Sequence, residues 1–248
     1  MRRNAVVFGL VTASLCVPAV AGAADRETDR GRLIHVVKDP ATKADVRIYE
    51  AGPNDLTLEV AQGALSVSKR LTNGRAVTTV REGRNEVRLS FDRAEFVIND
   101  GRGELVIAAG STDGARQMQA RIGQSALVRR GADLIGRVKA QTNSPLAHQL
   151  RSTRALLLLM VGDTTGRDEL AAYMRQLSAT KARPVSLQSP TDCWNLYAVE
   201  AIAAWMEYEQ CYAAIPWWDV LGMLACDVIY DMRAIGAFSW WVHCVALS

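Results

Sequence analysis

The sequence predicts an α+β protein with an N-terminal antiparallel β-meander, a helical middle and a C-terminal disulfide-stapled helical hairpin. Three observations predict this class: short β-rich runs over residues 32–109, helical periodicity over residues 112–177, and two equally spaced cysteine pairs after residue 191. The expected parts are a signal peptide (1–23), an antiparallel β domain (24–110), a helical segment packing on the sheet (111–178), a linker (179–190) and an α-hairpin with two disulfides (191–248).

The first 23 residues have the composition of a secretory signal peptide. Arg2 and Arg3 precede an apolar stretch over residues 5–20, and Ala21-Gly22-Ala23 supplies the small residues that a signal peptidase recognises. The apolar stretch is short for a transmembrane helix, which needs about 20 residues. We therefore expect an exported protein, periplasmic or secreted, with cleavage after about Ala23.

Residues 32–109 contain short runs in which apolar and polar residues alternate, as in six to eight antiparallel strands. Turn sequences separate the runs, and Asn73-Gly74 supplies the positive φ angles of a two-residue hairpin. In residues 86–91, valine, leucine and phenylalanine alternate with glutamate, arginine and serine. This alternation predicts a sheet with one apolar and one charged face. Other parts of the protein are expected to cover only the apolar face.

The segment after the strands has helical periodicity. Residues 112–139 form either one helix or two shorter ones, because three glycines interrupt the pattern. Ser144-Pro145 is a cap followed by proline at the first helical position, and this helix is expected to end at Gly162. A further helix is expected over residues 167–177. Residues 179–190 contain two prolines and no periodicity, which indicates a linker.

The four cysteines that remain after signal removal are an even number, which in an exported chain indicates disulfides. The members of each pair lie 18 positions apart, or about 27 Å along a helix, so the bridges must join different helices. In an antiparallel hairpin, residues whose numbers have a constant sum lie at the same level. This geometry favours Cys193–Cys244 with Cys211–Cys226. The crossed pairing, Cys193–Cys226 with Cys211–Cys244, would need half-length helices and is the alternative.

Charge is distributed unevenly along the chain. From Asp192 onward there are seven acidic residues and only Arg233 as a basic one, although the whole chain carries +3. Such asymmetry indicates docking of the tail on the basic body, a charged partner, or simply a solvated surface. We expect no nucleic-acid partner and no cofactor.

The carboxylates of the tail are the weak candidates for catalytic residues, namely Glu200, Asp227 and Asp231. Asp227 and Asp231 share a helix face, and a carboxylate pair can do acid–base work when burial raises one pKa. A solvated stripe, or pairing with basic residues elsewhere, is the simpler interpretation. The cysteine and histidine spacings predict no metal site.

All six tryptophans lie in the tail, and two helices cannot bury so many rings between themselves. The rings therefore either pack on the rest of the protein or present an apolar surface to a partner. A protein or an apolar ligand is the expected partner, and a membrane surface is the alternative, although an acidic tail disfavours it. The candidate contact residues are Trp205, Trp217, Trp218, Trp240 and Trp241.

The expected function is that of an exported, non-enzymatic binding protein whose aromatic hairpin makes the contact. One alternative is a precursor whose C-terminal peptide is released as a bacteriocin-like molecule or toxin. The other is a hydrolase that uses the hairpin carboxylates.

Overall fold

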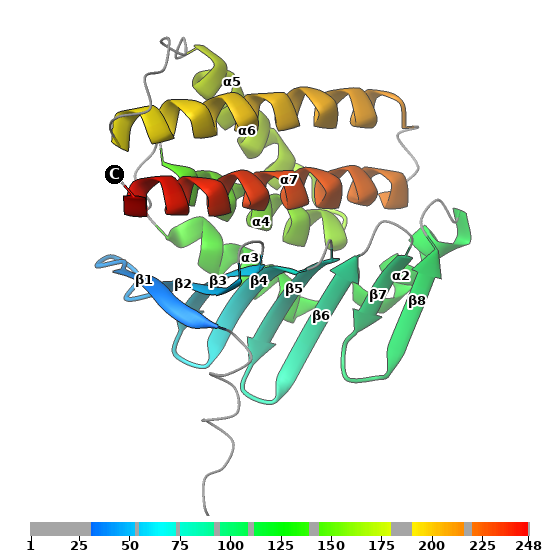
Figure 1. Cartoon of the computed structure of the whole chain (residues 1–248). Coiled ribbons are helices and arrows are strands. Elements are labelled where there is room, and N and C mark those ends of the chain that lie inside the picture. Colours follow the sequence, from blue (N-terminus) through cyan, green and yellow to red (C-terminus); the bar gives the residue numbers. More distant parts are fainter. Residues whose placement is uncertain are drawn as a thin grey trace, which may run out of the picture.

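The computed structural model shows an α+β protein in which helices cover one face of an antiparallel sheet (Figure 1). It describes residues 31–52, 55–72, 75–91, 95–108, 112–138, 144–179, 190–215 and 220–247. The signal peptide and residues 180–189, which make up most of the predicted linker, lie outside this part of the chain.

Eight strands follow one another in chain order, each antiparallel to the next, so the upper limit of the predicted six to eight is confirmed. Thr72 pairs with Arg75, which agrees with a two-residue hairpin at Asn73-Gly74, although those two residues lie outside the described ones. The strands are β1 (Arg32–Lys38), β2 (Asp45–Gly52), β3 (Asp55–Gln62), β4 (Leu65–Thr72), β5 (Arg75–Glu82), β6 (Asn85–Phe91), β7 (Glu95–Asn99) and β8 (Glu104–Ala108).

The sheet has a largely apolar inner face, as the alternation predicts. On the inner face, the pairing aligns side chains in rows across the strands, and the middle row reads Ile48, Leu58, Lys69, Thr78, Leu89 and Ile98. All six are buried, because the helices lie over this face. A lysine therefore stands in the centre of an otherwise largely apolar row.

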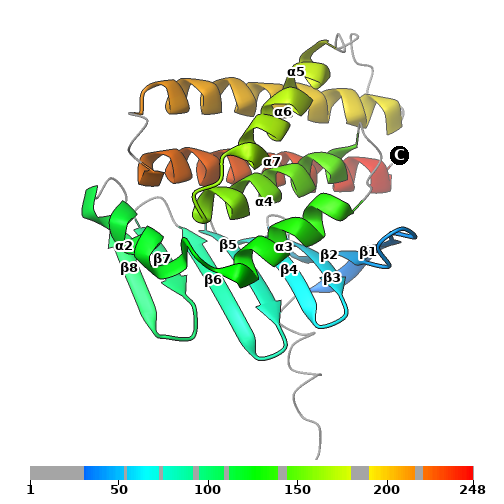
Figure 2. The same cartoon turned by 180° about the vertical axis from the view of Figure 1, so that it is seen from behind.

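Six helices are described: α2 (Thr112–Ile122), α3 (Ala126–Arg137), α4 (Pro145–Met160), α5 (Thr165–Ala179), α6 (Pro190–Ala213) and α7 (Val220–Leu247). Helix α3 lies across β3 to β6, and α7 contacts β4 and β5 (Figures 1 and 2). Helix α4 packs against α3, α5 and α7 and is buried along most of its length. At Gly131 an added Cβ would lie 2.7 Å from Val80 Cγ1, so glycine permits the close approach of α3 to β5.

Local sequence signals set the helix boundaries. Residues 112–138 form two helices, because α2 ends before Gly123 and the Ser125 side chain caps α3 by accepting from Val128 N. Ser144 caps α4 in the same way, with Pro145 at the first position. Gly162, at φ +75°, follows the end of α4, as predicted.

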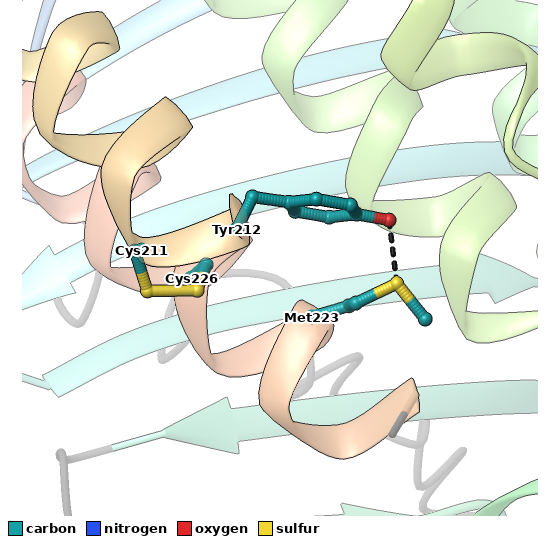
Figure 3. The surroundings of a disulfide bond; sticks show 4 residues. All are labelled: Cys211, Tyr212, Met223 and Cys226. Carbon is teal, nitrogen blue, oxygen red and sulfur yellow. Dashed lines mark hydrogen bonds between the residues drawn. A yellow bond between two sulfur atoms is a disulfide. The ribbon is translucent and has the colours of Figure 1, made fainter. Parts of the chain in front are cut away.

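Helices α6 and α7 form the predicted antiparallel hairpin, and both disulfides run between them. The nested pairing is confirmed, with Cα–Cα distances of 5.8 Å for Cys193–Cys244 and 5.9 Å for Cys211–Cys226. Figure 3 shows the second bridge near the turn, beside a hydrogen bond from the Tyr212 hydroxyl to Met223 Sδ. The crossed alternative does not occur.

The hairpin shares one hydrophobic core with the sheet and the middle helices. Its buried side chains belong to the same continuous cluster as those of the strands, and α7 contacts α4 as well as β4 and β5. The described rings of the tail therefore pack largely into this common core. This arrangement determines which tail residues are available for chemistry or contact.

Candidate functional site

The three predicted carboxylates occupy different environments. Asp227 and Asp231 share one face of α7, as predicted, and both are buried, so they do not form a solvated stripe. Glu200 is exposed on α6. The structure therefore does not assemble the three residues into one acidic site, and only the two aspartates face other polar side chains.

Asp231 meets a lysine that the sequence analysis did not identify. Lys69 Nζ on β4 lies 2.8 Å from Asp231 Oδ1, and each side chain is only 2% exposed. The lysine also donates to Ser152 Oγ at 3.1 Å, and the Ser152 hydroxyl donates to Asp231 Oδ1. Gln149 Oε1 accepts a longer hydrogen bond from Lys69, at 3.4 Å. Burial lowers the pKa of Lys69, and the charge of Asp231 partly offsets this effect.

A signal for Lys69 is present in the sequence. In ALSVSKRL, the lysine has the same strand parity as Leu65, Val67 and Leu71, so it faces the side that carries the apolar residues. The acidic tail and the basic body also indicate an attraction between the two parts, and Asp231 and Lys69 are one such pair. Ser152 gives no comparable signal, because its role depends on how α4 lies between β4 and α7.

His148 joins the cluster to two tyrosines. Its Nδ1 is hydrogen-bonded to the Tyr197 hydroxyl on α6 and its Nε2 to the Tyr230 hydroxyl on α7. Burial lowers the pKa of His148 to about 3, and the charges of Lys69 and Arg151 act in the same direction. The ring is therefore neutral near pH 7, so it donates to one tyrosine and accepts from the other.

Whereas the pKa of His148 is shifted downward, that of Asp227 is shifted upward. Burial raises its pKa to about 7, the nearby Tyr208 phenol lowers it, and the charge of Asp231 raises it further. Among the described residues, neither Asp227 Oδ2 nor the Tyr208 hydroxyl has a partner in hydrogen-bond geometry. At neutral pH this carboxyl is accordingly present in both protonation states.

These side chains form a buried polar cluster, defined by the following residues: Lys69, His148, Gln149, Ser152, Tyr197, Tyr208, Asp227, Tyr230 and Asp231. All of them are buried, so this conformation gives an external substrate no direct access to the amine, hydroxyl or carboxyl groups. The cluster connects β4, α4, α6 and α7. It can hold these elements together and can carry chemistry among its own members.

Of the five tryptophans predicted to contact a partner, the structure describes the side chains of Trp205 and Trp241, and neither is fully exposed. Trp205 is 5% exposed and packs on Tyr208 and Tyr230, so little of its ring is available to a partner in this conformation. Trp241 is partly buried and stacks on Phe238. Trp217, Trp218 and the side chain of Trp240 lie outside the described residues.

The outward side of the hairpin instead carries smaller apolar residues. Val199 and Met206, two helical turns apart on α6, are 42% and 53% exposed, and Ile229 on α7 is 42% exposed. Acidic side chains stand among them, with Glu200 and Glu209 exposed on α6. Among the described side chains of the hairpin, most rings and their polar partners are buried, whereas several aliphatic and acidic residues are exposed.

In the part of the chain that the structure describes, no helix is long and apolar enough to span a bilayer. The same residues contain no group of three or more histidine, cysteine or acidic side chains placed to hold a metal ion. Compared with protein-family models, with curated proteins and with solved structures, the chain matches none.

Proposed function

We propose that the protein is an exported, non-enzymatic binding protein whose hairpin contacts a protein partner through its outward side. The observation that carries the proposal is the exposure of Val199, Met206 and Ile229 on helices whose inner side chains are already used by the core. Apolar side chains that gather on a rigid surface and are rimmed by polar ones mark many protein contact sites. The two disulfides are compatible with an exported protein.

The charge of this surface indicates the chemistry of the partner. From Asp192 onward the chain has seven acidic residues and one basic residue, and Glu200, Glu207 and Glu209 are exposed on α6. The tail therefore favours a partner with apolar side chains among lysines or arginines. An anionic lipid surface would be repelled, and helices that lie on membranes usually carry basic residues on the polar side. A basic protein surface therefore fits the tail better than a bilayer.

The two alternative functions receive less support. Release of the tail as a peptide would expose Tyr197, Tyr230 and Phe238, which are fully buried against the body, and would separate Asp231 from Lys69. A hydrolase would need a substrate to reach the buried aspartates. Both alternatives would require a large opening of the fold.

The proposal is tested by capture from an exported fraction with the mature protein and a double variant, Val199→Ser with Met206→Ser. Loss of two central apolar contacts is expected to weaken capture by about tenfold or more. Val106→Ser on β8 is the matched control, because Val106 is also apolar and 50% exposed but lies on the sheet. Capture should weaken as salt is added and should be absent with anionic vesicles. Equal capture by the wild type and the double variant would contradict the proposal.

A further inference from the structure

The contact between Lys69 and Asp231 places an amine against a carboxyl group in a nearly closed environment. Nζ and Oδ1 are 2.8 Å apart, and each side chain is 2% exposed. An ion pair in such a place loses the hydration of both charges, which its Coulomb attraction does not necessarily offset. An amine that is held against a carboxyl group can also condense with it to form an amide.

We propose that Lys69 and Asp231 form an intramolecular isopeptide bond that links β4 to α7. The bond would join Lys69 Nζ to Asp231 Cγ and release one water. It needs no oxidant, reductant or cofactor, because the lysine supplies the nitrogen and the aspartate supplies the acyl carbon. This inference concerns the covalent structure of the chain and does not rest on the proposed binding function.

The environment favours the reactive form of both groups. Transfer of one proton from the ammonium of Lys69 to Asp231 Oδ1 converts the ion pair into a neutral amine and a neutral acid. Low polarity disfavours charges more than neutral groups, and burial lowers the pKa of Lys69 accordingly. A neutral amine has the lone pair that attack on Cγ requires.

Ser152 is placed to move the second proton. Its Oγ accepts from Lys69 Nζ at 3.1 Å, and its hydroxyl donates to Asp231 Oδ1. As Nζ attacks Cγ, the nitrogen gives a proton to Ser152 Oγ, and Ser152 gives its own proton to Oδ1. Oδ1 then holds two protons and leaves as water when the Cγ–Oδ1 bond breaks, while Oδ2 becomes the amide oxygen. Ser152 is unchanged at the end.

The fold supplies the proximity that such a reaction needs. The sheet fixes Lys69 in the middle of β4, between Leu58 and Thr78 on the neighbouring strands. The two disulfides fix α7 on α6, and α7 lies on β4. Groups held at contact distance react as if their concentration were about 10⁵ M or higher when orientation is also favourable. Folding would thus bring the two groups together, and condensation would follow.

The experiment is mass spectrometry of the purified mature protein after reduction of its disulfides. The proposal predicts a mass lower by one water than that of the mature chain. After digestion with trypsin, cleavage after Lys69 should be blocked, and residues 48–70 should remain joined to residues 182–233 in one branched peptide. Fragmentation of that peptide should place the link at Lys69 and Asp231.

Two variants separate this bond from any other loss of water. Lys69→Arg keeps a positive charge but removes the primary amine, so the branched peptide should disappear and the full mass should return. Ser152→Ala keeps both reactive groups and should slow bond formation by about a hundredfold, leaving an unlinked fraction in freshly made protein. If either variant fails to fold, the wild-type peptide map decides alone. An unmodified wild-type mass, or loss of water that persists in Lys69→Arg, would overturn the proposal.

Discussion

Asp227→Asn should change how the stability of the protein depends on pH. The pKa of Asp227 is raised to about 7 in the folded protein, from an ordinary value of 3.8. A raised carboxyl pKa means that the folded state binds the proton more tightly than the unfolded chain. The stabilisation is therefore fully present below pH 3.8 and is lost as the pH rises through about 7.

The magnitude follows from the two pKa values. One pKa unit corresponds to about 1.4 kcal/mol, so Asp227 should contribute about 3 kcal/mol more at about pH 4.5 than at about pH 7.5. Asparagine is neutral at both pH values, so it makes no pH-dependent contribution to the stability. His148, whose pKa is lowered to about 3, changes stability in the opposite direction, but it is present in both proteins and cancels from the difference.

Urea unfolding at the two pH values measures the effect. Tryptophan fluorescence reports on the tail, where all six tryptophans lie, and far-ultraviolet circular dichroism reports on the whole chain. The difference in unfolding free energy between wild type and Asp227→Asn should decrease by about 3 kcal/mol from the acidic to the neutral condition. Asp113→Asn is the matched control, since the Asp113 side chain is 81% exposed. Identical pH dependence in wild type and Asp227→Asn would refute the reasoning.

Two further substitutions test the inner side of the hairpin. Lys69→Met leaves the Asp231 carboxyl buried without an amine beside it and should cost at least about 3–5 kcal/mol in urea unfolding, and more where the proposed isopeptide bond is lost as well. The control is Arg70→Met on the opposite face of β4, whose partly exposed pair with Asp55 should be worth about 1 kcal/mol or less; similar losses would contradict the buried contact. Trp205→Ala should cost about 3–5 kcal/mol because it opens a cavity, whereas Met206→Ala should cost less than about 1 kcal/mol. Equal effects in thermal unfolding would place Trp205 on the surface instead.

Patterns of short range predicted most of the fold. Strand alternation and turn residues between residues 32 and 109 predicted the meander, because each antiparallel connection is local. The caps at Ser144 and Gly162 predicted both ends of α4. Helix geometry and the residue numbers favoured the nested disulfides over the crossed ones, since two full-length helices of fixed rise place the nested pairs at equal levels.

The buried polar cluster could be predicted only in part. The positions of Asp227 and Asp231 on one helix face were expected, and the parity of Lys69 in β4 was a readable signal. The bonds from His148 to Tyr197 and Tyr230 join residues far apart in the chain, and no spacing rule relates them. Their proximity depends on how three helices cross, which side-chain packing decides rather than periodicity.

The aromatic tail shows the limit of composition as evidence. Its rings indicated an interaction surface, but the position of Trp205 against Tyr230 is set by the docking of the hairpin on the body. Because Trp205 is buried on the inner side, the outward side of α6 offers a partner smaller apolar residues, such as Met206 and Val199. A count of aromatic residues cannot distinguish the inner from the outer side of a helix.

Hydrogen exchange of the mature protein tests most directly whether the hairpin belongs to the core of the body. If it does, amides in the middle of α7 and amides of β4 should open with the same free energy, because the two elements share the buried contact of Asp231 and Lys69. The same free energy is expected for α4, which lies between α3 and α7. Exchange of α7 at a clearly lower free energy, while β4 stays protected, would contradict the account and would restore the hairpin as an independent unit.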